Sequence, residues 1–312
     1  MSSKKQRAPL PPTTLQTPQW AYYQGAVRPY TDAKLHIAAE AVVRGLNVFE
    51  GLKGFWQPDG SFGLLAMEQH WQRLRKSAKL LYIPFEVTLD EWIGATHDLV
   101  ERLLTPERQM WIRATVYVTE GHWGENTKSD LVLTAFHCDK GPHKPMDTGV
   151  STWQRAADLA LPYRIKTSSN YQVARLAKIE GRERGYAEMI LLNQHGRLAE
   201  SVGSAVLVVR DGVILTPPPW EGAIESITVD ILEALAADLK IPFKRRPIDR
   251  TELIIADEMA FVSTLNDVTT IASLDGTEFS EPCILNALSK RYFAAADGTD
   301  PHPAVKVSRR QR

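Results

Sequence analysis

Hydrophobic and polar residues recur with two different periods in the first half of the chain, and each period predicts one type of element. Residues 67–81 carry apolar side chains at helical spacing, and a Thr-Leu-Asp-Glu capping box over 88–91 predicts the start of a second helix. Over residues 111–120 the period is two, with apolar even-numbered residues on one face. This segment is therefore predicted to be a half-buried strand with Trp111 and Arg113 on its other face.

The second half of the chain alternates helical stripes with short apolar runs. A helix is predicted from Tyr171 to about Arg184, closing at Gly185. After Ser226 the apolar residues again recur at helical spacing, which puts Ser226 and Thr228 in the first turn of a further helix. Strands are predicted at three apolar runs, the last two forming a hairpin: 189–192, 205–209 and 213–215. Together these patterns predict a mixed α/β (α+β) fold.

Glycine and proline residues gather between the two halves and predict a linker. Gly141-Pro142 and Gly149 are the strongest breakers in this stretch. The first residues of the chain are basic and then rich in proline and threonine, so we expect them to form a flexible arm. The predicted division is an arm over 1–18, a smaller α/β domain over 19–140, a linker over 141–151 and a larger domain over 152–312.

Composition and charge restrict the function classes open to this chain of 312 residues. Lys plus Arg and Asp plus Glu both number 37, so there is no global basic field for nucleic acid. No apolar run reaches the length that spans a bilayer, and no secretory signal is recognised, so no membrane partner is expected. The two cysteines, Cys138 and Cys283, fit a reducing cytoplasm better than a disulfide framework.

Three polar residues in the second half have the types that pyridoxal 5'-phosphate (PLP) chemistry requires. Lys166 offers an amine that can bond to the cofactor aldehyde, and Tyr171 offers a hydroxyl for the cofactor phenolate. Glu200 follows on a predicted strand and offers an anion that keeps the pyridine nitrogen protonated, so that the ring can accept electrons. Taken singly, each could instead be an ordinary solvated residue. Such a set needs an organic cofactor and no metal.

Two hydroxyl-rich segments could hold the phosphate of this cofactor. Ser226 and Thr228 lie in the first turn of a predicted helix, where backbone N–H groups lack partners and can bind an anion. Ser263 and Thr264 lie in a turn after a predicted strand and supply further donors. An ordinary helix cap and an ordinary turn are the alternative interpretations of these two segments.

Taken in order, these residues resemble the class IV, or fold-type IV, PLP-dependent aminotransferases, and most closely the branched-chain amino acid aminotransferases. The resemblance runs from about Tyr23 to Gly276. It is carried by the residues above and by a series of short motifs: Asp32-Ala33-Lys34-Leu35-His36, Val48-Phe49-Glu50-Gly51-Leu52-Lys53, His70-Trp71-Gln72-Arg73-Leu74, Ile112-Arg113, Leu198-Ala199-Glu200, Thr216-Pro217-Pro218, Ile227-Thr228 and Ala256-Asp257-Glu258.

This resemblance implies a two-domain fold with PLP in the interdomain cleft, and a ping-pong transfer of an amino group between an amino acid and a 2-oxo acid. Lys166 would bond to PLP and move the proton, Tyr171 would bond to the phenolate, and Glu200 would pair with the pyridinium. Further cofactor contacts are implied for Arg73, Ser226, Ile227, Thr228, Ser263 and Thr264, and substrate contacts for Phe49, Arg113, Arg44, Trp111 and Leu265. Since a loop of a second subunit completes the site in this family, a homodimer or higher homo-oligomer is expected.

The substrate pocket departs from the branched-chain pattern. Where those enzymes usually carry tyrosines, this chain has Arg44 and Trp111. A guanidinium in an otherwise aromatic pocket needs a partner or water. Arg44 could meet a second acidic group on the substrate, form a salt bridge to a nearby carboxylate or point to solvent. Valine, leucine or isoleucine as the substrate is therefore left open by the sequence.

Two other interpretations of the sequence stay open. The same scaffold also carries D-amino acid aminotransferases, R-selective amine transaminases and aminodeoxychorismate lyases. A non-catalytic ligand-binding or scaffold protein with this fold is the other alternative, against which the intact Lys166, Glu200 and phosphate segments argue. For the transaminase, 2-oxoglutarate is the expected amino acceptor.

Overall fold

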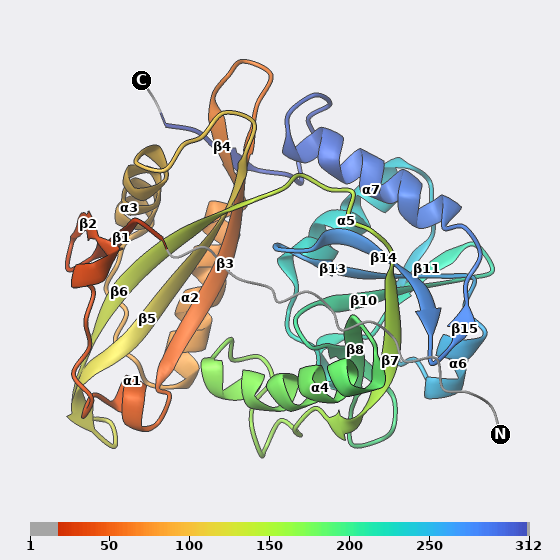
Figure 1. The fold of residues 1–312 in the computed structure, drawn as a ribbon, viewed down its shortest axis with the longest axis horizontal. Coiled ribbons are helices and arrows are strands. Elements are labelled where there is room, and N and C mark those ends of the chain that lie inside the picture. Colours follow the sequence, from red (N-terminus) through yellow and green to blue (C-terminus); the bar gives the residue numbers. More distant parts are fainter. Residues whose placement is uncertain (1–17, 311–312) are drawn as a thin grey trace.

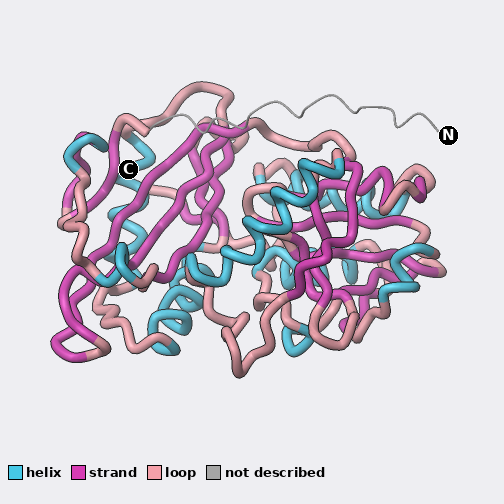
Figure 2. Tube along the Cα trace, turned by 60° about the horizontal axis from the view of Figure 1, so that its bottom comes forward, coloured by secondary structure: helices cyan, strands magenta, loops and turns pink. Residues whose placement is uncertain are grey.

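The structure is a computed structural model that describes residues 18–310, and it contains two β-sheets that lie side by side with helices beside each of them (Figure 1). A view from another direction also shows the strands in two separate groups (Figure 2). The first sheet comes mainly from the first half of the chain and the second sheet from the second half. The arm predicted over 1–18 lies, apart from Pro18, outside the described residues.

Seven antiparallel strands form the first sheet, in the order β16-β4-β3-β5-β6-β1-β2. The strands are β1 (Trp20–Tyr23), β2 (Ala26–Pro29), β3 (Asn47–Trp56), β4 (Phe62–Leu65), β5 (Gln109–His122), β6 (Glu125–Cys138) and β16 (Val307–Ser308). The helices of this half are η1 (Tyr30–Asp32), α1 (Glu40–Val43), α2 (Met67–Leu80) and α3 (Leu89–Glu101). Strand β3 lies between β4 and β5, and all of its residues from 48 to 55 are buried.

The elements predicted in the first half are confirmed. Helix α2 begins at Met67, and α3 follows Thr88, whose hydroxyl accepts a hydrogen bond from the N–H of Glu91. The Glu91 carboxylate in turn accepts from the Thr88 N–H, which completes the capping box. In β5 the even-numbered residues from 110 to 118 are buried, whereas Trp111 and Arg113 are half-buried on the face that meets the second half of the chain.

Nine strands form the second sheet, eight of them in the order β12-β11-β10-β13-β14-β7-β8-β9, with β15 paired to β14. β7 pairs in parallel with β8 and β14, and β11 pairs in parallel with β12. The strands are β7 (Met146–Gln154), β8 (Glu188–Leu192), β9 (Leu198–Ser201), β10 (Ala205–Arg210), β11 (Val213–Thr216), β12 (Phe243–Arg245), β13 (Glu258–Ser263), β14 (Asp267–Leu274) and β15 (Thr277–Glu278). The helices are η2 (Ser168–Asn170), α4 (Tyr171–Arg184), η3 (Pro219–Glu221), α5 (Ile227–Asp238), α6 (Arg250–Ile254) and α7 (Cys283–Ala296).

The predicted helix and hairpin of the second half are also confirmed. Helix α4 ends at Arg184, and Gly185 closes it with a φ of +77°. This left-handed conformation favours glycine because it has no β-carbon. Strands β10 and β11 pair in antiparallel fashion around Asp211 and Gly212, with φ of +51° and +75°. Two consecutive positive φ angles are typical of a two-residue hairpin turn.

Two boundaries differ from the prediction. Strand β7 begins at Met146, inside the segment 141–151 that the sequence assigned to the linker. Gly149 is not a breaker there, because a β-carbon at this position would lie 2.6 Å from the ring of Tyr186, so the strand uses glycine for close packing. The end of the chain is the other difference, since β16 pairs with β4 and so joins the first sheet.

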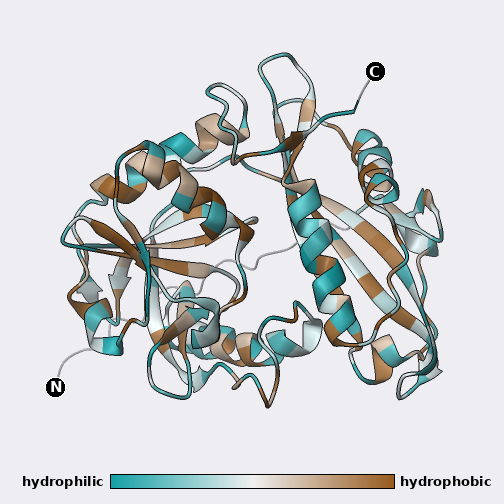
Figure 3. Cartoon of the chain, turned by 180° about the vertical axis from the view of Figure 1, so that it is seen from behind, coloured by the Kyte–Doolittle hydropathy of each residue, from teal (hydrophilic) through white to brown (hydrophobic). Residues whose placement is uncertain are grey.

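One hydrophobic core lies in the first half, where Trp92 and Leu74 of the helices pack against β3 and β5. A second core packs α5 and α7 against β10 and β13, and it also includes Phe55 and Leu65 of the first half. This second core therefore contributes to holding the two halves together. Coloured by hydropathy, the strands of the second sheet are mostly brown, whereas α2, which faces the viewer, is mostly teal (Figure 3). Between residues 18 and 310, no helix combines the length and apolar character that a membrane crossing requires.

The close packing at Gly149 can be tested with a matched pair of substitutions. Gly149→Ala should lower stability by about 1–3 kcal/mol, because its β-carbon would overlap Tyr186. Gly94→Ala, on the exposed side of α3 where a β-carbon meets nothing within 4 Å, should raise stability by about 0.5–1 kcal/mol. Thermal midpoints of the two variants and the parent provide the measurement, and a stabilising Gly149→Ala would contradict this account of β7.

Candidate active site

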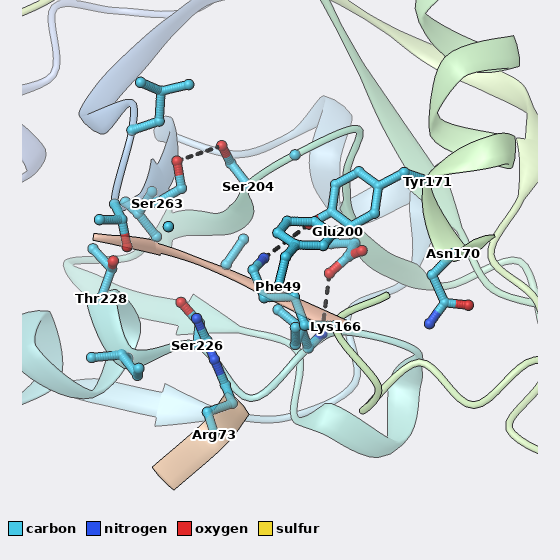
Figure 4. A pocket seen from close by; sticks show the side chains of 18 of the residues that line it. Phe49, Arg73, Lys166, Asn170, Tyr171, Glu200, Ser204, Ser226, Thr228 and Ser263 are labelled. Carbon is cyan, nitrogen blue, oxygen red and sulfur yellow. Dashed lines mark hydrogen bonds between the residues drawn. The ribbon is translucent and has the colours of Figure 1, made fainter. Parts of the chain in front are cut away.

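A cavity of about 250 Å³ lies between the two halves and is lined by residues from both. The first half contributes β3, β5 and one side chain of α2, and the second contributes the segment before α4, the N-terminus of α5 and the turn between β13 and β14. Every residue that the sequence analysis assigned to the site lines this cavity, with the exception of Arg44. Figure 4 shows the cavity and the side chains that point into it.

Lys166 lies in the irregular segment between β7 and α4 and is half-buried. Its Nζ donates to the hydroxyl of Tyr171, the first residue of α4, over 2.9 Å. Asn170 fixes the segment, because its Nδ2 donates to the carbonyl oxygens of Pro162 and Ile165 over 2.9 and 2.7 Å. The amine and the phenol predicted from the sequence are therefore neighbours in a segment held by its own hydrogen bonds.

Glu200 lies on β9 and is buried. One carboxylate oxygen accepts from the N–H of Ile224 over 3.1 Å, and the other lies 3.2 Å from Nε of Arg155. Arg155 is buried directly after β7 and also donates to the carbonyl oxygens of Gly222 and Asn170. The sequence analysis missed Arg155 as a site residue. Its partners come from three separate segments, so no spacing along the chain reveals it.

The N-terminus of α5 forms another end of the cavity. Ser226 is its N-cap, and the Ser226 hydroxyl accepts from the N–H of Val229 over 3.3 Å. The N–H groups of Ile227 and Thr228 open the same turn, where the positive end of the helix dipole lies. Thr228 is buried and lines the cavity. This end of the cavity therefore has the donors and the polarity that suit an anion.

Arg73 of α2 brings a fixed cation to the same end. Its Nε and Nη2 donate to Glu50 over 2.6 and 2.8 Å, and its Nη1 donates to the carbonyl oxygen of Glu225 over 2.6 Å. Burial by itself would raise the pKa of Glu50, but the charge and hydrogen bonds of Arg73 hold it well below its ordinary value. His70 bonds to the same carboxylate over 2.7 Å, and burial lowers the pKa of this imidazole.

The turn between β13 and β14 forms the third side of the cavity. The hydroxyl of Ser263 accepts from the hydroxyl of Ser204 and from the N–H of Asn266, both over 3.1 Å. Asn266 Nδ2 also donates to Ser204 Oγ over 3.0 Å, and Thr264 and Leu265 at the tip of the turn line the cavity. Ser204, which the sequence analysis missed, ties this turn to the start of β10. Its partners lie much later in the chain, so only the fold brings them together.

The wall formed by β3 and β5 is mostly aromatic. The guanidinium carbon of Arg113 lies 3.9 Å from the centre of the Phe49 ring, which is a cation–π contact. The indole of Trp111 packs directly on β3, since a β-carbon at Gly51 would lie 2.8 Å from its Nε1. Burial lowers the pKa of Arg113, and no carboxylate of residues 18–310 forms an ion pair with it. Arg113 is thus a cation that the described protein leaves without a counter-ion.

Arg44 does not line the cavity. Its Nη1 forms an ion pair with Glu40 over 3.0 Å, and its guanidinium carbon lies 4.4 Å from the centre of a Trp123 ring. Glu40 is buried and also accepts from the N–H of Trp123 over 3.0 Å. The sequence left three arrangements open for Arg44, and the structure shows one of them, a salt bridge to the nearby carboxylate of Glu40.

The donor set fits PLP. The N–H groups of α5, the nearby hydroxyls and Arg73 suit a phosphate, the amine of Lys166 suits an aldehyde, and the carboxylate of Glu200 suits a protonated pyridine nitrogen. In Figure 4, Arg73 and Thr228 lie to one side, and Lys166 and Glu200 lie to the other. A single cavity therefore separates an anion site from an amine and a carboxylate, as a phosphorylated pyridine cofactor requires.

Comparisons with known proteins agree with this site. Residues 47–274 match the family model described as amino-transferase class IV. A probable branched-chain-amino-acid aminotransferase of Synechocystis is 33% identical over 263 residues, which cover 82% of this chain and 85% of that protein.

Solved structures give the same result. The branched-chain aminotransferase of Thermoproteus uzoniensis with norvaline is 26% identical, with a TM-score of 0.87, and the match covers 93% of this chain and 99% of that one. The PLP form of the branched-chain amino acid aminotransferase of Thermobaculum terrenum is 28% identical, with a TM-score of 0.84, and the match covers 93% and 98%. The chain therefore belongs to the class IV aminotransferases, and it is a PLP-dependent transaminase of the branched-chain aminotransferase type.

Proposed function

We propose that this transaminase moves the amino group of an L-amino acid with an apolar side chain to 2-oxoglutarate. The observation that carries the proposal is Arg113, a half-buried cation in the cavity without a carboxylate partner among the described residues. The other two arginines of the cavity are paired, Arg73 with Glu50 and Arg155 with Glu200. Arg113 is therefore the cation of the cavity that can receive a substrate carboxylate.

The rest of the substrate wall supports an apolar side chain. Phe49 and Trp111 form one side, and Leu265 and Val262 approach from the second half. Arg44 was the reason that the sequence left branched-chain substrates in question. In the structure it is paired with Glu40 and does not line the pocket. A solved relative with norvaline, an unbranched apolar amino acid, is consistent with a pocket of this type.

Bound PLP supplies an electron sink for the electron pair released at the substrate α-carbon. Lys166 is the group that moves the proton. Its Nζ takes the proton from the α-carbon of the amino acid and, in the reverse half-reaction, returns a proton to the α-carbon of the 2-oxo acid. The hydroxyl of Tyr171, 2.9 Å from this Nζ, orients the amine.

The remaining residues of the cavity bind and orient the cofactor and the substrate and do not take part in proton transfer. Glu200 is fixed by Arg155 and by the N–H of Ile224, so its carboxylate is oriented toward one end of the cavity without needing to reorganise. Arg73 and the first turn of α5 bind the phosphate at the other end. Arg113 binds and orients the substrate carboxylate over the Phe49 ring.

Assembly, location and domain division belong to the same proposal. The large side chains of Ile37 and Trp123 are 80% and 76% exposed on the first half, and a homodimer or higher homo-oligomer would cover them.

The two cysteines are unpaired in the structure, which supports a reducing cytoplasm. We assign residues 19–140, together with β16, to a smaller domain, and residues 146–306 to a larger, cofactor-binding domain.

A donor panel tests the proposed reaction directly. PLP-loaded protein should form glutamate from L-leucine and 2-oxoglutarate, and it should form none from D-alanine or from an R-arylamine. Glutamate formation is the measurement. A faster reaction with D-alanine than with L-leucine would overturn the stereochemical part, and pyruvate released from aminodeoxychorismate without an acceptor would indicate a lyase instead.

Arg113→Leu should raise KM for every amino acid and 2-oxo acid substrate. The lost contact is a charge-assisted hydrogen bond worth about 1.5–3 kcal/mol, which corresponds to roughly 10- to 100-fold in kcat/KM. Arg113→Lys is the matched control, because it keeps the charge and loses the paired donors. Its kcat/KM should lie between those of the parent and of Arg113→Leu. Steady-state kinetics with L-leucine and 2-oxoglutarate check this, and an unchanged kcat/KM in Arg113→Leu would remove Arg113 from the substrate site.

Arg44→Gln should leave substrate choice unchanged, because Arg44 pairs with Glu40 rather than lining the cavity. The ratio of kcat/KM for leucine to that for glutamate should stay within roughly two-fold of the parent. Stability should fall by about 1 kcal/mol, since the partly exposed ion pair is lost. A tenfold shift of the kinetic ratio with no change in thermal midpoint would instead make Arg44 a substrate contact.

A further inference from the structure

A buried ion pair outside the cavity joins the two halves of the chain. Lys53 of β3 and Asp267, the first residue of β14, are both fully buried, and their charged atoms lie 2.5 Å apart. Neither residue lines the cavity, and neither takes part in the chemistry described above. Because desolvating two charges offsets most of their attraction, such a pair adds little stability compared with an apolar contact. The Lys53–Asp267 pair is therefore better explained by a role other than stability.

The contacts of this pair lead to the turn between β13 and β14. Lys53 Nζ also donates to the carbonyl oxygen of Leu265 over 3.3 Å, and Leu265 is at the tip of that turn. Asp267 ends the turn with a φ of +50°, a left-handed conformation that aspartate adopts more readily than most other residues. Nε2 of His143, from the segment between β6 and β7, lies 3.2 Å from the same oxygen of Asp267 that Lys53 contacts.

Strand β3 holds each of the other site segments in a comparable way. Its Phe49 N–H donates to the carbonyl oxygen of Lys166 over 2.9 Å. Its Glu50 fixes Arg73, which donates to the carbonyl oxygen of Glu225 immediately before the cap of α5. Lys53 makes the corresponding contact to the third segment.

We propose that the Lys53–Asp267 pair is a positioning device that sets the turn 263–266 before cofactor and substrate bind. Within the second half, Ser204 holds the turn at its base through Ser263 and Asn266. Lys53 fixes the tip, so Thr264 and Leu265 meet the ligand in one conformation. A preformed turn binds more tightly because the cost of ordering it is removed from the binding step. Lys53 and Asp267 are thus positioning residues that act through Thr264 and Leu265.

The chain contains a matched control for this pair. Lys178 of α4 also contacts one carboxylate and one backbone carbonyl, Glu188 Oε2 over 3.0 Å and Ala187 O over 2.6 Å. That pair lies within the second half and does not line the cavity. Neutralising it removes the same types of contact without touching the turn.

The experiment compares Lys53→Met/Asp267→Asn with Lys178→Met/Glu188→Gln in the full-length protein. Both charges are removed in each variant, so no buried charge is left unpaired. Three quantities are measured: the dissociation constant of PLP, the hydrogen exchange of the peptide covering 262–268 with and without PLP, and kcat and KM for L-leucine. Lys53→Met alone, in which Asp267 keeps His143 as a partner, is the second variant if the double variant does not fold, and it should show the same faster exchange of the peptide.

The Lys53/Asp267 variant should exchange the 262–268 peptide at least about tenfold faster without PLP, and PLP should dissociate about tenfold more readily. KM should rise more than kcat falls, because the chemistry at Lys166 is untouched. The Lys178/Glu188 variant should match the parent in all three quantities. Equal exchange of the peptide in both double variants, or a PLP dissociation constant within twofold of the parent, would reduce the pair to an ordinary structural contact.

Discussion

The ion pair between Glu50 and Arg73 is the interaction on which the geometry of the active site depends. Glu50 is fully buried in the middle of β3, so its charge needs a partner, and Arg73 supplies two of its nitrogens to meet it. The third nitrogen is thereby aimed at Glu225, next to the first turn of α5. Because Glu50 needs a partner inside the first half, Arg73 is held in place there. Its contact to Glu225 then fixes the position of the first turn of α5 in the second half.

Much of the site could be predicted from the sequence because its main residues have local signals. Lys166 and Tyr171 lie close together in the chain, and Ser226 caps a helix whose apolar period is visible. Arg155 and Lys53 had no such signal, since their partners lie far along the chain and are reached only through the sheets. Burial also overrides local rules, as at Gly149, where a residue typical of a turn occupies a strand so that Tyr186 can pack on it.

Arg44 shows the opposite case, because a local signal in the sequence already indicated its partner. Glu40 and Arg44 are four residues apart, the spacing at which opposite charges pair on a helix. The resemblance instead implied a substrate contact for Arg44. In the structure the local ion pair forms, and Arg44 does not line the cavity. Arg113 has no such neighbour, and its isolation rather than its charge distinguishes it from the paired arginines of the site.

Gly51 has a consequence for how this pocket can diverge. The indole of Trp111 rests so closely on β3 that even a single methyl group at Gly51 would displace it, and both residues line the cavity. Any residue larger than glycine there would reduce the space for the substrate, so substitutions at this position can only make the pocket smaller. Broader substrate range has to come from β5, by shortening Trp111, or from Leu265, whose side chain is 42% exposed and free to change in size.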